Sequence, residues 1–223
     1  MPILTKLSDK EVKRWVYTTT PRAKTKEKTP ACITLSRCSG SGGKLVAKKV
    51  AQKLGFKFYN KKVIRLIAKQ SKKRKSLVES LDESSQDLVN NLLKSLIGED
   101  YLSGRAYIKY LCQVILTLAK KGKVVILGRG GNFIIPKQTA LRVKIAAPFE
   151  TRVENTRRFE KMSAEKARDF ALRVDKERKK FVSNYFYKDI NNANYYDLVI
   201  NTQYITVDKA ADIVIKAFKK KFG

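Results

Sequence analysis

The fold is decided by the stretch ACITLSRCSGSGGK, which runs from Ala31 to Lys44. Its first six residues form an apolar, β-rich run of strand length, and a cluster of serine and glycine follows from Ser39 to Gly43. Beyond the cluster, apolar side chains recur near helical spacing up to Leu54, and Gly55 predicts the helix end. The order strand, glycine loop, helix is typical of α/β domains that hold phosphate between the first strand and the first helix.

Outward from this stretch, strands alternate with helices along the chain. Further strands are predicted at 124–127, 141–145 and 197–201. Helices are predicted at 61–70, 82–97, 103–120 and 207–220, with two charged helices across 149–185. This alternation predicts an α/β fold with a doubly wound parallel sheet. We expect one domain over 31–223, preceded by a polar N-terminal arm or linker over 1–30.

The composition limits the chemistry. The 223 residues are 43% hydrophobic, which is enough for a core and excludes a wholly disordered chain. The chain has 49 Lys and Arg against 20 Asp and Glu, a formal net charge of +29, which attracts polyanions and phosphorylated ligands. It contains no histidine, so a Ser-His-Asp or Cys-His pair and a His-ligated metal site are excluded.

The cysteines and the first residues bear on location. The three cysteines, Cys32, Cys38 and Cys112, have no C-x-x-C spacing, so neither a disulfide framework nor a zinc site is indicated. The start of the sequence shows no secretory pattern, and its apolar runs are far shorter than a membrane span. We therefore expect a cytoplasmic protein without a membrane partner.

The glycine loop matches the P-loop pattern G-x-x-x-x-G-K-[ST] only in part. With Gly43-Lys44 as its G-K pair, Cys38 replaces the first glycine and Leu45 replaces the hydroxyl that binds Mg²⁺. With Gly40-Ser41-Gly42 aligned to the G-S-G of nucleoside monophosphate kinases, Gly43 replaces the lysine instead. Neither frame is complete, but strand, loop and helix together favour an anion site over a tight turn without a ligand.

Four segments, in order, resemble the cytidylate kinase-like family of P-loop proteins: 33–43, 124–135, 173–178 (RVDKER) and 196–202 (YDLVINT). The resemblance covers about residues 31 to 220. It implies a P-loop NTPase-type sheet with helical acceptor-binding and lid regions. It also implies ATP-dependent phosphoryl transfer, with Mg²⁺, to a nucleoside monophosphate, CMP or dCMP first.

The resemblance also implies site residues. Residues 39–44, which are Ser39, Gly40, Ser41, Gly42, Gly43 and Lys44, would bind the ATP phosphates. Arg129 would hold the acceptor phosphate, and Arg37 and Asn132 are expected on the same acceptor side. Lys44, Arg173 and Arg178 would act on the transferred phosphoryl group, with Asp175 orienting the lid arginines. The chain departs from cytidylate kinases at Gly130, where they carry the aspartate of G-R-D, and at Asn201, where they carry that of L-D-T.

Arginine suits phosphoryl transfer, because its planar fork grips phosphate oxygens in pairs. Two alternatives remain open from the sequence. The arginines of 157–178 fit a solvated helix face, and Asp169 and Arg173 have the i,i+4 spacing of an ion pair. The incomplete loop also fits a non-catalytic P-loop module that binds nucleotides or nucleic acid.

A basic stretch follows the loop. No acidic residue occurs between Glu27 and Glu79, while thirteen Lys and Arg lie between Lys44 and Lys75. This stretch predicts non-specific binding of nucleic acid. A general lysine bias of the chain is the alternative explanation.

Overall fold

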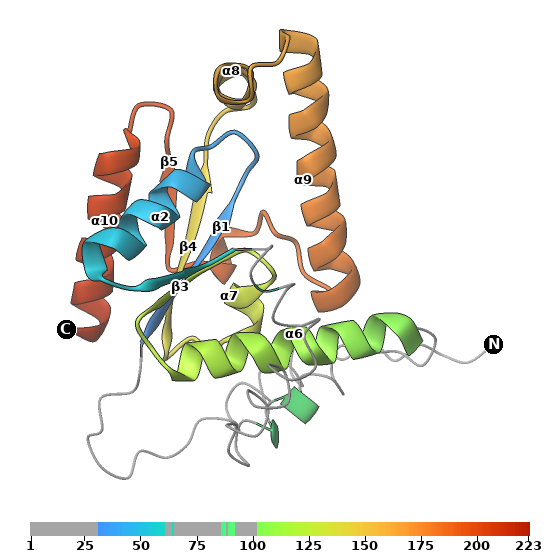
Figure 1. The fold of residues 1–223 in the computed structure, drawn as a ribbon, viewed down its shortest axis with the longest axis vertical. Helices are drawn as coiled ribbons and strands as arrows, with labels where there is room; N and C mark the ends of the chain where they lie inside the picture. Colours follow the sequence, from blue (N-terminus) through green and yellow to red (C-terminus); the bar gives the residue numbers. More distant parts are fainter. Residues whose placement is uncertain (1–30, 61–63, 65–85, 88, 92–101) are drawn as a thin grey trace.

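A computed structural model of the chain describes residues 31–60, 64, 86, 87, 89–91 and 102–223, with 102–106 described by their backbone alone. Five parallel strands form one sheet in the order β2-β3-β1-β4-β5 (Figure 1). The strands are β1 (Cys32–Arg37), β2 (Lys57–Tyr59), β3 (Val124–Leu127), β4 (Ala140–Ala146) and β5 (Leu198–Asn201). The predicted doubly wound α/β fold is confirmed.

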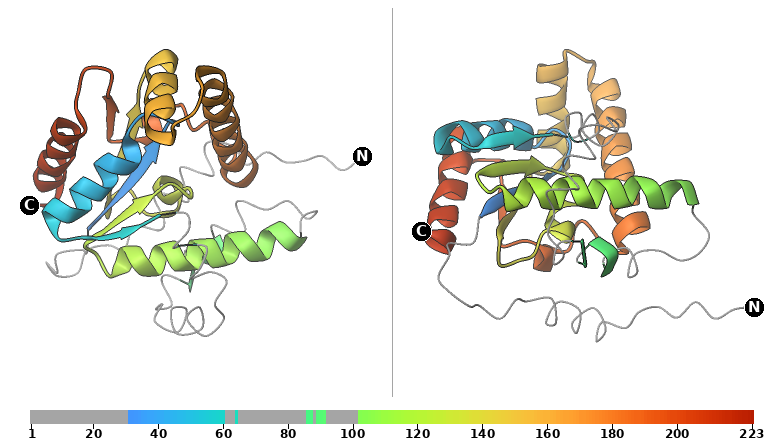
Figure 2. Two further views of the ribbon diagram at one scale, coloured as in Figure 1. Left: turned by 45° about the horizontal axis from the view of Figure 1, so that its top comes forward. Right: turned by 60° about the horizontal axis from the view of Figure 1, so that its bottom comes forward.

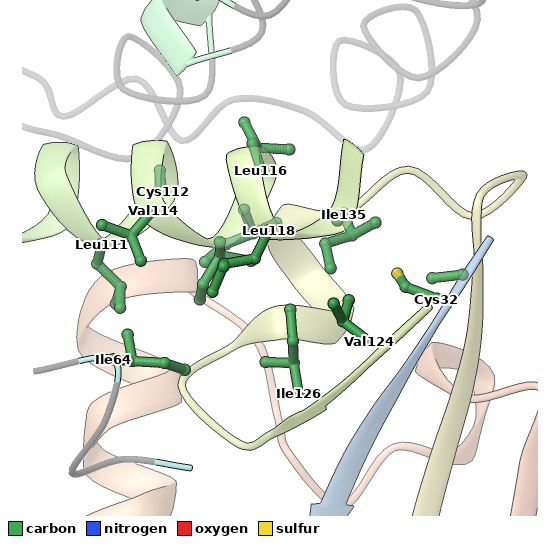
Figure 3. Packing of buried hydrophobic residues seen from close by; sticks show 14 of the residues in the cluster. Cys32, Ile64, Leu111, Cys112, Val114, Leu116, Leu118, Val124, Ile126 and Ile135 are labelled. Carbon is green, nitrogen blue, oxygen red and sulfur yellow. The ribbon is translucent and has the colours of Figure 1, made fainter. Parts of the chain in front are cut away.

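Helices cover both faces of the sheet (Figure 2). One face packs against α2 (Gly43–Leu54) and α10 (Val207–Phe222), around a core that includes Leu35, Val50 and Val143. The other face packs against α6 (Leu102–Lys120) and α7 (Gly131–Ile134), with Leu111, Val124 and Ile126 in its core (Figure 3). Strands β1 and β3 are buried on both faces, as expected for central parallel strands.

Two helices follow β4: the first lies beyond the carboxyl end of β4, and the second runs from there back along the side of the molecule (Figure 1). These helices, α8 (Phe149–Glu160) and α9 (Ala164–Phe186), pack against each other as a hairpin. Ser163 caps the start of α9 by accepting a hydrogen bond from the amide of Lys166. A short 3₁₀ turn, η1 (Ala193–Tyr195), leads from α9 to β5. The hairpin carries Arg173 and Arg178, which the resemblance assigns to the lid, and we call it the lid hairpin.

The structure confirms most of the expected elements. The strands at 31–36, 124–127, 141–145 and 197–201 and the helices at 103–120, 149–185 and 207–220 are present within one or two residues of the expected ends. Strand β2 and helix α7 were not predicted. The arm over 1–30 and most of the helices at 61–70 and 82–97 lie outside the described residues. Within the two helix ranges, the described residues 64, 86, 87 and 89–91 are helical. Among the described residues, no helix combines the length and apolar character that a membrane span needs.

Candidate nucleotide-binding site

The loop between β1 and α2, residues 38–42, forms the floor of the candidate site. Gly40 and Gly42 take φ of +73° and +72°, in the left-handed region that glycine enters without a steric penalty. Gly42 is the N-cap of α2, so the amides of Gly43 and Lys44 belong to its first turn. In the described part of the chain, neither amide donates to an acceptor. The loop therefore presents free N–H groups at the positive end of a helix dipole.

Two other segments fix the loop from outside. Asn155 Nδ2 on α8 donates to the carbonyl of Gly40 at 3.0 Å, and Thr202 Oγ1, after β5, donates to the carbonyl of Ser41 at 2.9 Å. A Cβ on Gly40 would overlap the backbone carbonyl of Arg152, so only glycine allows α8 to approach this closely. The carbonyls of Gly40 and Ser41 thus accept hydrogen bonds from neighbouring segments, and the amides at the start of α2 remain free of partners among the described residues.

Asp175 on α9 ties the lid hairpin to the loop. Its carboxylate accepts hydrogen bonds from the amide of Ser39 at 2.8 Å and from Arg152 Nη1 at 2.6 Å. Arg152 also donates to the carbonyl of Ser39 at 3.1 Å. Arg178, one turn further along α9, lies 3.4 Å from the same carboxylate and donates to the carbonyl of Arg37 at 3.0 Å. Loop, α8 and α9 thus share one network of charge-assisted hydrogen bonds.

A pocket of about 170 Å³ opens beside the loop, between the carboxyl ends of β1 and β3 and the face of α9. Arg37, Arg129 and Arg178 contribute guanidinium groups to its lining. Arg129 Nη1 donates to Tyr107 Oη at 3.1 Å, and its guanidinium lies 4.9 Å from the centre of the Phe181 ring. The pocket stands at the carboxyl end of the strands, which is where parallel α/β sheets bind ligands.

The pocket carries an excess of positive charge. Burial, together with repulsion from Arg178 and Arg129, lowers the pKa of Arg37 to about 9, although Asp175 acts in the opposite direction. Burial likewise lowers the pKa of Arg178. Both shifts mean that the surroundings disfavour the charged guanidinium groups. An anion placed among the three arginines would reverse this, so the pocket is suited to a phosphate group.

One wall of the pocket carries polar groups. Asn132 lines it, and Asn132 Nδ2 is buried with no hydrogen-bond partner in the described part of the chain. Lys144 on β4 donates from Nζ to the carbonyl of Ile190 at 2.9 Å, and Tyr196 Oη donates to the same carbonyl at 2.8 Å. An unpaired buried amide is costly, so Asn132 Nδ2 is suited to donate a hydrogen bond to an acceptor atom of a ligand in the pocket.

The structure brings most of the predicted residues together and leaves two at the edge. Arg37, Arg129, Asn132 and Arg178 line the pocket. The side chain of Arg173 is 62% exposed and pairs with Glu177 at 3.3 Å. The alternative of a solvated helix face thus describes Arg173, with Glu177 as the partner in place of Asp169. Lys44 is exposed at the start of α2 and is not part of the pocket lining.

Three residues of the network, Arg152, Asn155 and Thr202, did not emerge from the sequence. Thr202 follows directly after a strand, a position that could have indicated its role. Arg152 and Asn155 lie in a helix where arginine and acidic residues alternate, and nothing in that pattern distinguishes them.

The donor groups around the loop do not fit a metal ion held by the protein. The described residues contain no group of three Cys, Asp or Glu side chains that could hold one. Asp175 is the carboxylate at the loop, and Arg152, Arg178 and the Ser39 amide already bond to it. Ser41 Oγ is buried and donates to the carbonyl of Cys38 at 2.9 Å.

The sequence and the fold have known relatives. The model of the cytidylate kinase-like family matches residues 32–204. The chain is 28% identical over 172 residues to a cytidylate kinase of Pyrococcus horikoshii, covering 76% of this chain and 79% of the relative. It is 23% identical over 189 residues to a cytidylate kinase of Sulfolobus acidocaldarius, covering 85% and 94%. A crystal structure of a protein from Eubacterium ventriosum superimposes with a TM-score of 0.68 at 23% identity, covering 86% of this chain and 99% of the other.

Proposed function

The chain belongs to the cytidylate kinase-like family, and we propose that it transfers a phosphoryl group from ATP to a nucleoside monophosphate, with CMP or dCMP as the first choice of acceptor. Membership of this family, together with the P-loop kinase type of fold, supports a phosphotransferase role. The choice of acceptor and the turnover itself are proposals.

One observation carries the proposal: three arginine side chains, from β1, the β3–α7 loop and α9, line one pocket next to a glycine loop with free amides. Phosphoryl transfer needs little covalent chemistry from the protein. It needs donors and cations placed around phosphate oxygens whose charge grows in the transition state. A loop for the donor phosphates beside a cationic pocket for the acceptor phosphate meets this need.

The proposed roles follow from position. The loop from Ser39 to Lys44 binds the phosphates of ATP, and Arg129 holds the phosphate of the acceptor. Arg178 reaches the transferred group from the lid helix, and Asp175 positions it through the network with Arg152. Asn132, at the polar wall, contacts the acceptor nucleoside. Arg173 contributes only if it leaves Glu177 during turnover.

We assign no protein ligand to Mg²⁺. The metal enters the proposal only with ATP, because Mg²⁺ in kinases is commonly bound through substrate phosphates and few protein groups. When bound, it would screen the phosphate charges. The residues of this chain bind, orient and neutralise the same phosphates with amides and guanidinium groups.

A second function has its own supporting observation. The position of the P-loop lysine holds Gly43 in one frame, and Lys44 is exposed. A module that binds nucleotides without turnover would tolerate both features. The basic stretch from Lys44 to Lys75 further supports contact with nucleic acid, although only residues 44–60 and 64 of it are described.

A panel of nucleoside monophosphates with Mg·ATP separates the two functions, with a coupled kinase assay to measure transfer and thermal shift to measure binding. We expect transfer to CMP or dCMP, stabilisation by ATP or ADP, and loss of that stabilisation in Gly42→Val, which places a side chain in the loop. Arg129→Ala should raise the KM of the acceptor, whereas Arg178→Ala should mainly lower kcat. Nucleotide binding without transfer to any acceptor would favour the binding module. No thermal shift with any nucleotide would remove both functions.

A further inference from the structure

The starting point is the space around Gly43, the first residue of α2. Gly43 is buried, and a Cβ built on it would lie 2.5 Å from Cβ of Arg37 and 3.2 Å from both Arg37 Cγ and Ile145 Cβ. Real Cβ atoms do not approach this closely, so no other residue fits here while Arg37 keeps its place. The side-chain path that a P-loop lysine would take from this position is filled by the stem of Arg37.

The other end of Arg37 lies at the next loop of the sheet. A Cβ on Gly128 would overlap Arg37 Nη1, so the guanidinium lies directly against the backbone that follows β3. Arg37 therefore extends from the start of α2 to the β3–α7 loop. It passes between the amides proposed for the ATP phosphates and the arginine proposed for the acceptor phosphate. A phosphoryl group moving from donor to acceptor crosses the same gap.

In the described part of the chain, the positive charges around Arg37 exceed the negative ones. Arg129 and Arg178 line the same pocket, and their repulsion adds to burial in disfavouring the charge on Arg37. Two carboxylates lie near, and both have other partners: Asp175 bonds to Arg152 and the Ser39 amide, and Glu177 pairs with Arg173. A cation held this way gains most when an anion with several charges arrives.

We propose that Arg37 replaces the missing P-loop lysine and contacts the phosphoryl group in flight between ATP and the acceptor. This inference rests on the proposed function and refines it, because the sequence alone placed Arg37 with the acceptor. A lysine on the loop grips the outer phosphates of the nucleotide. Here the cation comes from the end of β1, and the loop carries glycine at residue 43 to make room for it.

Kinetics distinguish this role from acceptor binding. A residue that holds the acceptor phosphate in the ground state changes KM, whereas one that meets charge in the transition state changes kcat. We expect Arg37→Met to lower kcat by about 100-fold, with less than about a threefold change in the KM of CMP. The matched control is Arg168→Met, which removes an exposed arginine paired with Glu150 outside the site and should leave kcat unchanged. A raised KM with unchanged kcat, or kinetics like those of the wild type, would overturn the inference.

Moving the cation provides a second test. Arg37→Gly clears the stem from Gly43, so Arg37→Gly with Gly43→Lys places a lysine on the loop in the usual way. The double variant should recover about tenfold in kcat over Arg37→Gly alone, because the cation again reaches the transferred group. A folded double variant without recovery would contradict the proposal.

Measurements of nucleotide binding test the role of Arg37 independently of the proposed kinase activity. Calorimetry with a non-hydrolysable ATP analogue and with ADP needs no turnover. Arg37→Met should raise the Kd of the analogue by about tenfold and the Kd of ADP by less than about threefold, because only the analogue carries the outermost phosphate. Equal losses for both nucleotides would overturn the role of Arg37. If the wild type binds both but transfers nothing, the kinase proposal fails and this comparison still decides where Arg37 acts.

Discussion

The carboxylate of Asp175, on the lid helix α9, accepts a hydrogen bond of 2.8 Å from the backbone amide of Ser39 in the glycine loop. The two residues are 136 positions apart in the sequence. A carboxylate bonded to a loop amide imitates the contact that a phosphate makes there. The lid hairpin is therefore held to the loop by the same kind of bond that we propose the loop makes with nucleotide phosphates.

Removing this carboxylate should destabilise the protein. Asp175→Ala leaves Arg152, whose side chain is 12% exposed, without its anionic partner, so we expect a loss of about 2 kcal/mol in the free energy of unfolding. Urea denaturation measures it. The control is Glu154→Ala, which breaks the exposed pair with Arg157 and should leave the midpoint unchanged. Equal midpoints for the two variants would refute a structural role of the network.

The backbone strain at Arg129 can be measured separately from its proposed role in acceptor binding. Arg129 has φ of +57°, between Gly128 and Gly130, which also have positive φ. A positive φ is strained in a residue that has a Cβ, so Arg129→Gly should be about 1 kcal/mol more stable than Arg129→Ala. Both variants should raise the KM of the acceptor alike, since both lack the guanidinium. Thermal denaturation and steady-state kinetics of the pair test this, and identical stabilities would show that the turn is unstrained.

The departure from the G-R-D pattern has a steric explanation. A Cβ on Gly130 would overlap the ring of Phe186, and φ there is +67°. We expect Gly130→Asp, which introduces the aspartate of the cytidylate kinase G-R-D pattern, to lower the free energy of unfolding by about 3 kcal/mol or more. Gly130→Asp should destabilise the Phe186→Ala variant less than it destabilises the wild type, because the ring that the new side chain overlaps is then absent. Denaturation of the four proteins gives this coupling, and strict additivity would argue against the overlap.

The ionisation of Asp197 makes the stability of the fold depend on pH at low pH. Burial alone would raise its pKa, but hydrogen bonds from Arg142 and Lys221 outweigh burial and lower the pKa to about 2. A lowered pKa stabilises the fold above the unfolded value, which is 3.8, and this contribution is lost as the pH falls towards 2. The contribution is at most about 2 kcal/mol, reduced by solvent screening. The stability gap between the wild type and Asp197→Asn should thus be full at pH 5 and narrow below pH 4. A gap independent of pH would contradict the assignment.

The charge of +29 gives a prediction on nucleic acid. If the basic stretch contacts phosphates, log K should fall with log[salt], and charge reversal at Lys72, Lys73 and Lys75 should flatten the slope by about two to three units. Fluorescence anisotropy over a salt series measures both. Reversal at Lys216, Lys219 and Lys220, three exposed lysines of α10, is the matched control. If both triple variants flatten the slope equally, a general lysine bias explains the binding.

Local patterns predicted the fold well, and their limits were also local. The run of β3 is apolar throughout and that of β1 is apolar at Cys32, Ile33 and Leu35, so their burial is evident from sequence. Strand β2, with only three residues of which Lys57 is exposed, carries too little pattern to detect. Helix α7 starts at Gly131 and has only four residues, so no helical period can develop.

The site was predictable where residues follow strands and less so on helices. Arg37 and Arg129 lie at strand ends, and topology alone brings such positions together. Helix geometry could have shown that the two lid arginines differ in role. Arg173 and Arg178 are five residues apart, or about 140° around the helix, so their side chains cannot both face one pocket. Asp175 and Arg178, three residues apart, share a face. The role of Arg152 depends on how α8 approaches Gly40, which is a matter of tertiary packing.

The order of the strands has a consequence for how the protein folds. Strand β1 pairs with β3 and β4, so Ile33 meets Val125 and Leu141, about a hundred residues further along the chain. Closing such large loops is slow, because the entropy of the chain is lost before the contacts form. The three arginines of the pocket become neighbours only after these pairings and the return of α9. A nucleotide can therefore bind only to a nearly complete molecule, and it should slow unfolding much more than it speeds refolding.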